Sequence, residues 1–393
     1  YKALSRSRKE QYDIRMGYVA FAGGDYRKAY DYFDRIGSRS EYVDHARYYK
    51  AYIDYAEGRY GRAKQGFETL ARSDAYGDVV PYYLLQIEFR ENNYDYVVAN
   101  GIPLLAKATE ARQQEISRIV SEAYFHLGDY PKALAYMDNY AKLGGEMGRE
   151  ELYLAGYCNY VDRDYPKAID RLTQVASGGD ELAQNASFHL GDAYLQMGDK
   201  KKAMSAFALA ASDDFDQAIR EEAMFNYGKL QYELGGGIFN EAITTLDNYI
   251  KEFPDSPRIN EAREILLAAY FNSRNYNAAY EAIRQLPDPD NNVKMALQKI
   301  AYFRALECFE AGDYDRTLEL LDVADANRYT AKYTALTKFW RAETYVRKGD
   351  YAKAQPLYEA YVALSPSNER ENRMAQYNLG YCYFNAKQWD KAA

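Results

Sequence analysis

The chain contains 393 residues, carries a formal net charge of −8 at pH 7 and has an isoelectric point near 5.3. Its Lys and Arg residues form no long run, which argues against nucleic acid as a partner, because neutralising phosphates requires clustered cations. The sequence also lacks a run of roughly 18 apolar residues, so we expect no membrane-spanning helix.

A short motif recurs along the chain: Gly-Asp or a polar equivalent, then an aromatic residue, then a small residue three positions later. We call the position of the aromatic residue the mark of its unit. The marks are Tyr26, Tyr60, Tyr94, Tyr130, Tyr165, Lys200 (in place of an aromatic), Phe239, Tyr276, Tyr314, Tyr351 and Trp389. Consecutive marks lie 34 to 39 residues apart, and a fixed period in this range predicts a protein of stacked repeats.

Each unit contains a helix-length segment on either side of its mark. Around Gly198-Asp199, for example, apolar residues recur at helical spacing both before and after the break. Glycine tolerates the positive φ that commonly follows a helix end, and aspartate can accept hydrogen bonds from the free N–H groups of the next helix. Pro131 and Pro166 follow their marks, and proline is favoured in the first turn of a helix. The unit is therefore predicted to be helix, tight turn, helix.

Small residues recur at two fixed places in the unit and predict close helix crossings. Three residues after the mark, nine of the eleven units carry alanine. Nine residues before the mark lie Gly17, Ala51, Ser121, Gly156, Gly191, Ala305, Ala342 and Gly380. Glycine inside a helix costs about 1 kcal/mol relative to alanine, so its recurrence indicates a packing requirement. Seven residues after the mark, Phe33, Phe67, Phe207 and Tyr358 are expected to fill the space between units.

These motifs resemble the tetratricopeptide repeat, a helix-turn-helix unit of 34 residues. The unit around Lys200 matches best, with Leu190-Gly191, Tyr194, Ala203, Phe207 and Ala210 at the family's positions. The resemblance implies an all-α fold: a right-handed superhelical solenoid of about eleven repeats, with residues 1–393 forming one domain. The segment 249–257 resembles repeats of bacterial envelope proteins, so we expect a location in the bacterial periplasm or cell envelope, with the cytoplasm as the alternative.

Some units depart from the pattern. The chain begins at Tyr1 without a methionine and stops within the last repeat, so we expect a piece of a longer protein. The unit at Tyr94 lacks both small positions, Gly235-Gly236-Gly237 lengthens one turn, and residues 287–292 are expected to form a loop.

No motif for catalysis or metal binding is present. His45, His126 and His189 form no metal-binding spacing, and Cys158, Cys308 and Cys382 lie in three different units, where we expect small buried residues. No nucleophile elbow and no phosphate-binding loop occur. We therefore expect no enzymatic activity, no cofactor and no metal.

Tyrosine gives the strongest indication of function, with 43 residues. In the first helix of several units, aromatic residues lie twelve, eight and five residues before the mark, a spacing that places them on one stripe of the helix. We call these residues the aromatic stripe: Tyr18, Phe21, Tyr48, Tyr52, Tyr55, Tyr153, Tyr157, Tyr160, Tyr377, Tyr381 and Phe384. The resemblance implies that the stripe faces a concave groove that holds peptides. The alternative is that it packs against neighbouring helices.

The sequence thus predicts a non-enzymatic scaffold that binds a protein or peptide partner in a tyrosine-rich groove. Two alternatives stay open: a structural component that self-associates, as a homo-oligomer, and an accessory region whose active domain lies outside the chain. The carboxylate clamp that some members of the family use is not expected, since its asparagine is replaced by Tyr18, Tyr52, Glu122, Tyr157, Asp192 or Tyr381.

Overall fold

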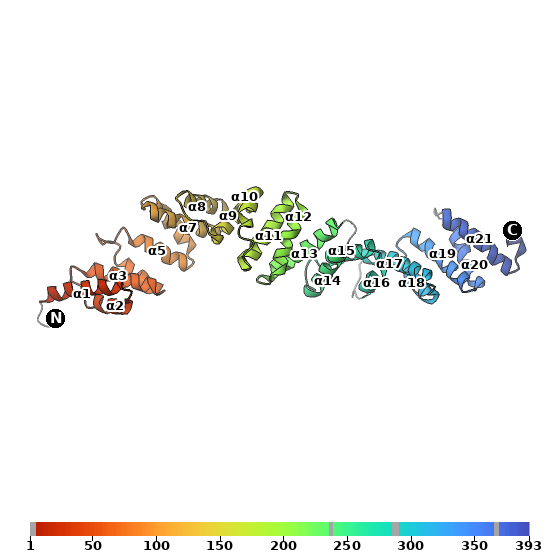
Figure 1. Cartoon of the computed structure of the whole chain (residues 1–393), viewed down its shortest axis with the longest axis horizontal. Helices are drawn as coiled ribbons and strands as arrows, with labels where there is room; N and C mark the ends of the chain where they lie inside the picture. Colours follow the sequence, from red (N-terminus) through yellow and green to blue (C-terminus); the bar gives the residue numbers. More distant parts are fainter. Residues whose placement is uncertain (1–4, 236–238, 285–290, 365–368, 393) are drawn as a thin grey trace. The chain divides into compact units, whose positions relative to one another are not determined.

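The computed structural model describes residues 5–235, 239–284, 291–364 and 369–392, and every regular element in these ranges is a helix (Figure 1). The all-α prediction is therefore confirmed. Contacts divide the chain into two compact units, residues 1–197 and 198–393, which are described separately below. A single continuous solenoid over 1–393 stays a prediction.

The first compact unit contains five helix pairs and one further helix. They are α1 (Arg6–Ala22) with α2 (Tyr26–Phe33), α3 (Val43–Ala56) with α4 (Tyr60–Glu68), α5 (Val80–Arg90) with α6 (Tyr94–Leu105), α7 (Glu110–His126) with α8 (Tyr130–Lys142), α9 (Arg149–Val161) with α10 (Tyr165–Thr173), and α11 (Glu181–Gln196).

The second compact unit contains one helix and five further pairs. They are α12 (Lys200–Ser212), then α13 (Gln217–Leu234) with α14 (Asn240–Glu252), α15 (Ile259–Asn272) with α16 (Tyr276–Arg284), α17 (Asn291–Glu310) with α18 (Tyr314–Ala326), α19 (Ala331–Arg347) with α20 (Tyr351–Ala363), and α21 (Glu369–Asn385) with α22 (Trp389–Ala392). Asn291 and Asn292 open α17, so the loop expected over 287–292 is wrong at these two residues. Positions 287–290, like Gly236 and Gly237, lie outside the described residues.

Each mark lies at the start of the second helix of its pair, as the motif predicts. Ten marks are the first residue of that helix, and Phe239 is the residue directly before α14. The residue before the mark caps the helix: Asp25 Oδ1 accepts a hydrogen bond from the Lys28 backbone N–H at 3.1 Å. The same cap is made by Asn93, Asp129, Asp164, Asp199, Asp313 and Asp350. A cap of this kind contributes roughly 1 kcal/mol.

The turn before the cap requires a left-handed residue. Gly24, Gly58, Gly128, Gly198, Gly312 and Gly349 have φ values between 76° and 80° there. Asn92, Arg163, Arg274 and Lys387 adopt the same conformation with φ of 58° to 63°. The turn is therefore kept where glycine is absent, at a conformational cost of about 1 kcal/mol for each side chain.

Small residues in the first helix allow the large residue of the second helix to approach closely. A Cβ atom added to Gly17 would lie 2.5 Å from Phe33 Cε1, and one added to Gly156 would lie 2.9 Å from Leu172 Cγ. At the same crossing in the pair α7–α8, Ser121 Oγ donates a hydrogen bond to the Ala133 carbonyl at 2.7 Å. The expected close crossing is thus confirmed at these pairs.

The pair α5–α6 reverses this arrangement. Nine residues before its mark stands Leu85, fully buried, and seven after it stands Gly101, where the other pairs place a large side chain. A Cβ atom on Gly101 would lie 3.4 Å from Leu85 Cδ1 and 2.6 Å from Val120 Cγ2. The large residue has moved to the first helix and the small residue to the second, so the crossing keeps its small–large pairing.

The longer turn before α14 displaces the small residue by two positions. Gly228 lies eleven residues before the mark instead of nine, and an added Cβ atom would lie 2.9 Å from Leu246 Cδ2. The packing requirement is therefore met in this pair too.

Helices of neighbouring pairs also touch through their first members. Within the two compact units, α1 contacts α3, α5 contacts α7, α9 contacts α11, and α13, α15, α17 and α19 contact one another in succession. Side chains that project from this side of successive first helices can therefore contact each other, which positions the site described below.

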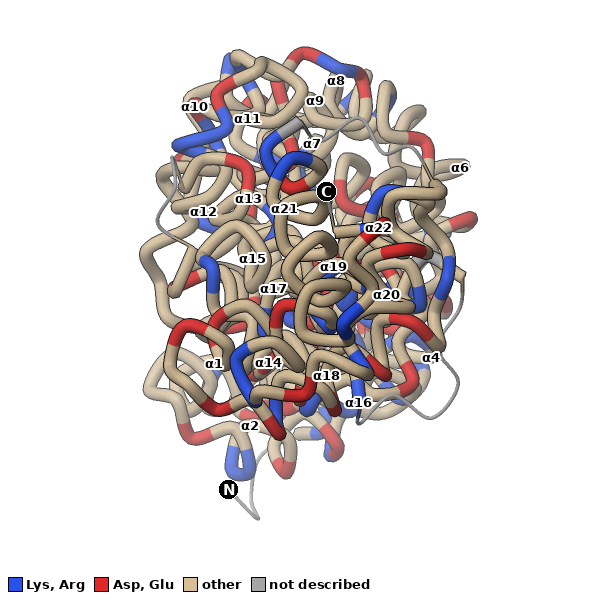
Figure 2. The backbone as a smooth tube through the Cα atoms, turned by 90° about the vertical axis from the view of Figure 1, so that its right-hand side faces the viewer, with Lys and Arg blue, Asp and Glu red and all other residues tan. Residues whose placement is uncertain are grey.

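Two properties of the surface agree with the composition. Among the described residues, no helix is both long and apolar enough to cross a membrane. Acidic and basic residues are interspersed along the helices (Figure 2).

Substituting Gly17 with alanine should destabilise the protein, because the new methyl group would overlap the ring of buried Phe33. We expect a loss of about 1–3 kcal/mol, measured as faster amide hydrogen exchange in α1 and α2. Gly61→Ala in α4 is the matched control, since no atom lies within 4 Å of its added Cβ. It should leave exchange unchanged or slow it, and equal effects of the two substitutions would contradict the packing account.

Candidate interaction face on the first helices

The aromatic stripe of the first compact unit is half-buried between successive first helices. Tyr52 on α3 contacts Phe21 on α1, with ring centroids 5.4 Å apart, and Tyr83 on α5 at 5.8 Å. Tyr48 stacks on Tyr76 at 4.3 Å, and its hydroxyl lies 3.2 Å from that of Tyr83. The stripe thus bridges consecutive pairs and at the same time keeps part of each ring accessible.

A second cluster lies on α9 and is closed by a histidine of α11. His189 contacts the rings of Tyr157 at 4.8 Å and Tyr160 at 5.1 Å, with Tyr153 further away at 6.5 Å. Tyr160 donates a hydrogen bond from its hydroxyl to Asp192 Oδ2 at 2.5 Å. These tyrosines therefore pack against the next first helix and are partly buried, and the peptide-binding groove stays a prediction.

Burial raises the pKa of the tyrosines in both clusters. Desolvation raises the pKa of Tyr48, Tyr153 and Tyr160, and Asp192 contributes to the shift at Tyr160. It also raises the pKa of Tyr76 to about 12. The hydroxyls are therefore neutral at pH 7, which suits hydrogen bonding and contact with apolar groups.

Other stripe residues are more exposed. Tyr18 on α1 has 54% of its surface exposed, and Tyr377, Tyr381 and Phe384 on α21 are also exposed, Tyr377 at 78%. Tyr55 donates a hydrogen bond to Gln86 Oε1 at 2.7 Å and lines a small cavity of about 190 Å³ together with Arg90 and Arg118. The structure brings the stripe residues together in local groups on α1–α3, α9 and α21.

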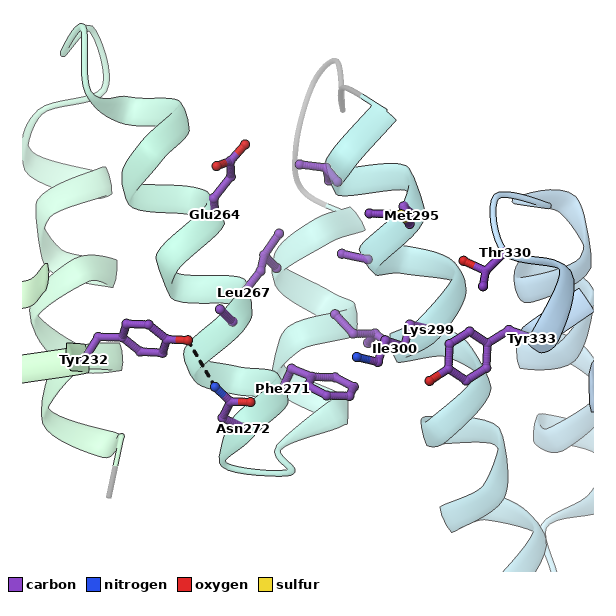
Figure 3. A pocket seen from close by; sticks show the side chains of 13 residues that line it. Tyr232, Glu264, Leu267, Phe271, Asn272, Met295, Lys299, Ile300, Thr330 and Tyr333 are labelled. Carbon is purple, nitrogen blue, oxygen red and sulfur yellow. Dashed lines mark hydrogen bonds between the residues drawn. The ribbon is translucent and has the colours of Figure 1, made fainter. Parts of the chain in front are cut away.

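The second compact unit contains a pocket of about 600 Å³ that the sequence did not indicate (Figure 3). Its walls come from the first helices α13, α15, α17 and α19. The lining residues are Tyr232, Glu264, Leu267, Ala268, Phe271, Asn272, Val293, Met295, Ala296, Lys299, Ile300, Thr330 and Tyr333. Most of this lining is apolar.

Three of these residues occupy the stripe positions of their own unit. Glu264, Ala268 and Phe271 lie twelve, eight and five residues before Tyr276. The search for aromatic residues missed them because only one of the three is aromatic. Their position relative to the mark was the available signal.

Contacts around the pocket hold its polar side chains in place. Asn272 Nδ2 donates to the Tyr232 hydroxyl at 3.1 Å, as drawn in Figure 3. Lys299 Nζ lies 3.7 Å from the centroid of the Phe271 ring, a cation–π contact. Tyr333 packs against Tyr302 at 5.1 Å, and desolvation raises its pKa.

Cysteine and histidine take no visible part in chemistry. The three cysteines are buried and free, as expected. Burial raises the pKa of Cys158 to about 12 and that of Cys382 to about 11, which keeps both thiols protonated at neutral pH. Within the described ranges, no group of His, Cys, Asp and Glu side chains has the arrangement of a metal site.

Helix pairs with a left-handed turn, an acidic cap and a small–large crossing define a helical-hairpin repeat protein. Models of the tetratricopeptide repeat match residues 153–219, 222–256 and 341–393. Residues 153–219, 222–256 and 341–393 therefore contain tetratricopeptide repeats.

Solved structures similar to this chain are also tetratricopeptide proteins. One from Parabacteroides merdae is 14% identical, covers 68% of this chain and 98% of its own length, and has a TM-score of 0.34. The C-terminal part of one from Cytophaga hutchinsonii is 15% identical, covers 74% of this chain and 98% of its own length, and has a TM-score of 0.38. The TPR2AB domain of yeast Sti1, in its complex with pHSP90, is 13% identical, covers 71% of this chain and 100% of its own length, and has a TM-score of 0.36. None of the curated proteins matches the chain.

Acidification should destabilise the α9–α11 cluster. Burial lowers the pKa of His189 to about 4, although the charge of Asp192 acts in the opposite direction. The Nδ1 atom of His189 is buried without a hydrogen-bond partner. An unfolded histidine titrates near 6.5, so the unfolded state takes up the proton first as the pH falls. The contribution of neutral His189 to the free energy of unfolding should be fully present above about pH 6.5. The free energy of unfolding should fall by up to about 2 kcal/mol at pH 5.

The measurement is the melting temperature of wild type and His189→Phe between pH 7 and pH 5. The variant keeps an aromatic ring in the cluster, so its melting temperature should fall less than that of the wild type. Parallel decreases in the two proteins would contradict the assignment to His189.

Proposed function

We propose that the chain is a non-enzymatic interaction scaffold that binds a protein or peptide partner along the face formed by its first helices. The observation that carries the proposal is the position of the accessible aromatic groups. The exposed and half-buried stripe residues of the first compact unit, and the pocket of the second, are all formed mainly by first helices.

The chemistry of this face supports binding. Tyrosine offers a large contact area with few rotatable bonds, and its hydroxyl can stay hydrated or donate a hydrogen bond. A pocket of several hundred Å³ with apolar walls and a few polar groups is typical of a ligand site. The tetratricopeptide fold supports an interaction role, although fold alone does not define an activity.

Site-specific photo-crosslinking tests the proposal. A benzophenone amino acid replaces Tyr18 or Met295, which are 54% and 48% exposed on the proposed face. Tyr12 on α1 (44%) and Leu209 on the second helix α12 (53%) are matched controls outside the stripe and the pocket. In a lysate of the source organism, we expect discrete adducts from positions 18 and 295 only. Equal adducts from the controls would place binding elsewhere.

Self-association is the second candidate function, and an exposed cluster on α21 and α22 favours it. Tyr377, Phe384 and Trp389 are 78%, 55% and 56% exposed, and the rings of the last two lie 5.1 Å apart. Contiguous exposed apolar groups commonly mark an interaction surface.

Sedimentation velocity over a range of concentrations separates the two candidates. A monomer at all concentrations supports the scaffold and excludes self-association. If the chain instead associates, the double variant Tyr377→Ser and Phe384→Ser should remain monomeric at concentrations where the wild type does not. The double variant Tyr12→Ser and Leu209→Ser is the control and should associate like the wild type.

A further inference from the structure

The pocket of the second compact unit includes a stripe position at which four other units carry a tyrosine. Eight residues before the mark, α3 carries Tyr52 and α9 carries Tyr157, and each ring contacts an aromatic ring of the following first helix, Tyr83 or His189. In α15 this position is Ala268, the smallest residue found there in the eleven units. Ala268 carries no ring that could fill this space, and it lines the pocket.

The walls around Ala268 suit an aromatic ring. The rings of Phe271 and Tyr333 line the pocket, and aromatic pairs with centroids roughly 4.5–7 Å apart gain energy beyond the area they bury. Leu267 and Ile300 add aliphatic surface, and Met295, 48% exposed, is a flexible side chain that adapts to the shape of a ligand.

Lys299 adds a charge to the pocket. Its ammonium group is held over Phe271 at 3.7 Å, and the ion pairs formed among the described residues do not include it. The side chain is half-buried, so a carboxylate brought next to it would be less screened than on an open surface. Glu264, on the neighbouring turn of α15, is exposed, and its charge disfavours a ligand with many acidic groups.

We propose that this pocket binds an aromatic side chain of a protein or peptide partner, and that an Asp or Glu next to that side chain pairs with Lys299. This inference rests on the proposed scaffold function and specifies the chemistry of its partner. A basic neighbour is repelled by Lys299, and a small apolar side chain contacts less of the apolar wall than an aromatic ring does.

A random peptide library displayed on phage, selected on the full chain, tests the inference without knowledge of the partner. The wild-type chain should enrich peptides in which Phe, Tyr or Trp stands next to Asp or Glu. A synthetic peptide of the enriched sequence, labelled with a fluorophore, then serves as the probe, and fluorescence anisotropy gives its Kd.

Two variants define the site and one is the control. Ala268→Tyr places a ring in the pocket and should raise the Kd of the probe at least about tenfold. Lys299→Gln should raise the Kd of the probe about three- to tenfold and remove the preference for the acidic peptide over its amide analogue. Ala326→Tyr, on an exposed position of the second helix α18 outside the pocket, should bind like the wild type. Circular dichroism melting of each variant confirms that it is folded.

The outcomes separate this inference from the proposed function. If peptides are enriched but Ala268→Tyr binds them as tightly as the wild type, the inference is overturned while a binding role elsewhere on the face is still supported. If enriched peptides lack an acidic neighbour and Lys299→Gln has no effect, the part of the inference that concerns Lys299 is overturned. If no peptide is enriched and no crosslink forms at positions 18 and 295, the scaffold function fails as well.

Discussion

The fold depends on a close crossing within most of the helix pairs, where a small residue on one helix meets a large residue on the other. The contact distances at Gly17, Gly156 and Gly228 leave no room for a methyl group. This crossing sets the distance between the two helices of a pair, and the buried ring or aliphatic side chain at the crossing completes the packing. In a stacked repeat protein, stability is approximately a sum of such local interfaces. The proposed binding face therefore lies on a framework that is set pair by pair.

Much of this framework could be predicted from the sequence because it is local. The left-handed turn, the acidic cap and the mark follow one another within a few residues, and each has a physical reason to prefer its residue type. The small residue before the mark is recognised only when the units are compared, but in most units it stands at the same distance of nine residues from the mark. Gly228 escaped that count because the turn before α14 is longer by two residues.

The candidate site was harder to predict because it depends on contacts between pairs. The spacing of Tyr52, Tyr157 and their neighbours on one helix stripe was readable. How much of each ring the next first helix covers was not, since Tyr83 and His189 belong to following units. The pocket was missed for a related reason. It results from the absence of a large side chain at Ala268, and a search for aromatic residues does not detect an absence.

The reversed crossing between α5 and α6 has a consequence for how this chain can change by recombination. Most pairs place the small residue on the first helix, so exchanging one such hairpin half for another keeps a small residue opposite a large one. A first helix with Leu85 fits a second helix that carries a small residue such as Gly101, where an added Cβ atom would lie 3.4 Å from Leu85 Cδ1. Joined to any other second helix, it would set two large side chains against each other, and Gly101 opposite Gly17 would leave a void. Because an added Cβ atom at Gly101 would also lie 2.6 Å from Val120 Cγ2 on α7, this hairpin must be exchanged together with a following helix that fits it, whereas halves of the other hairpins are closer to interchangeable parts.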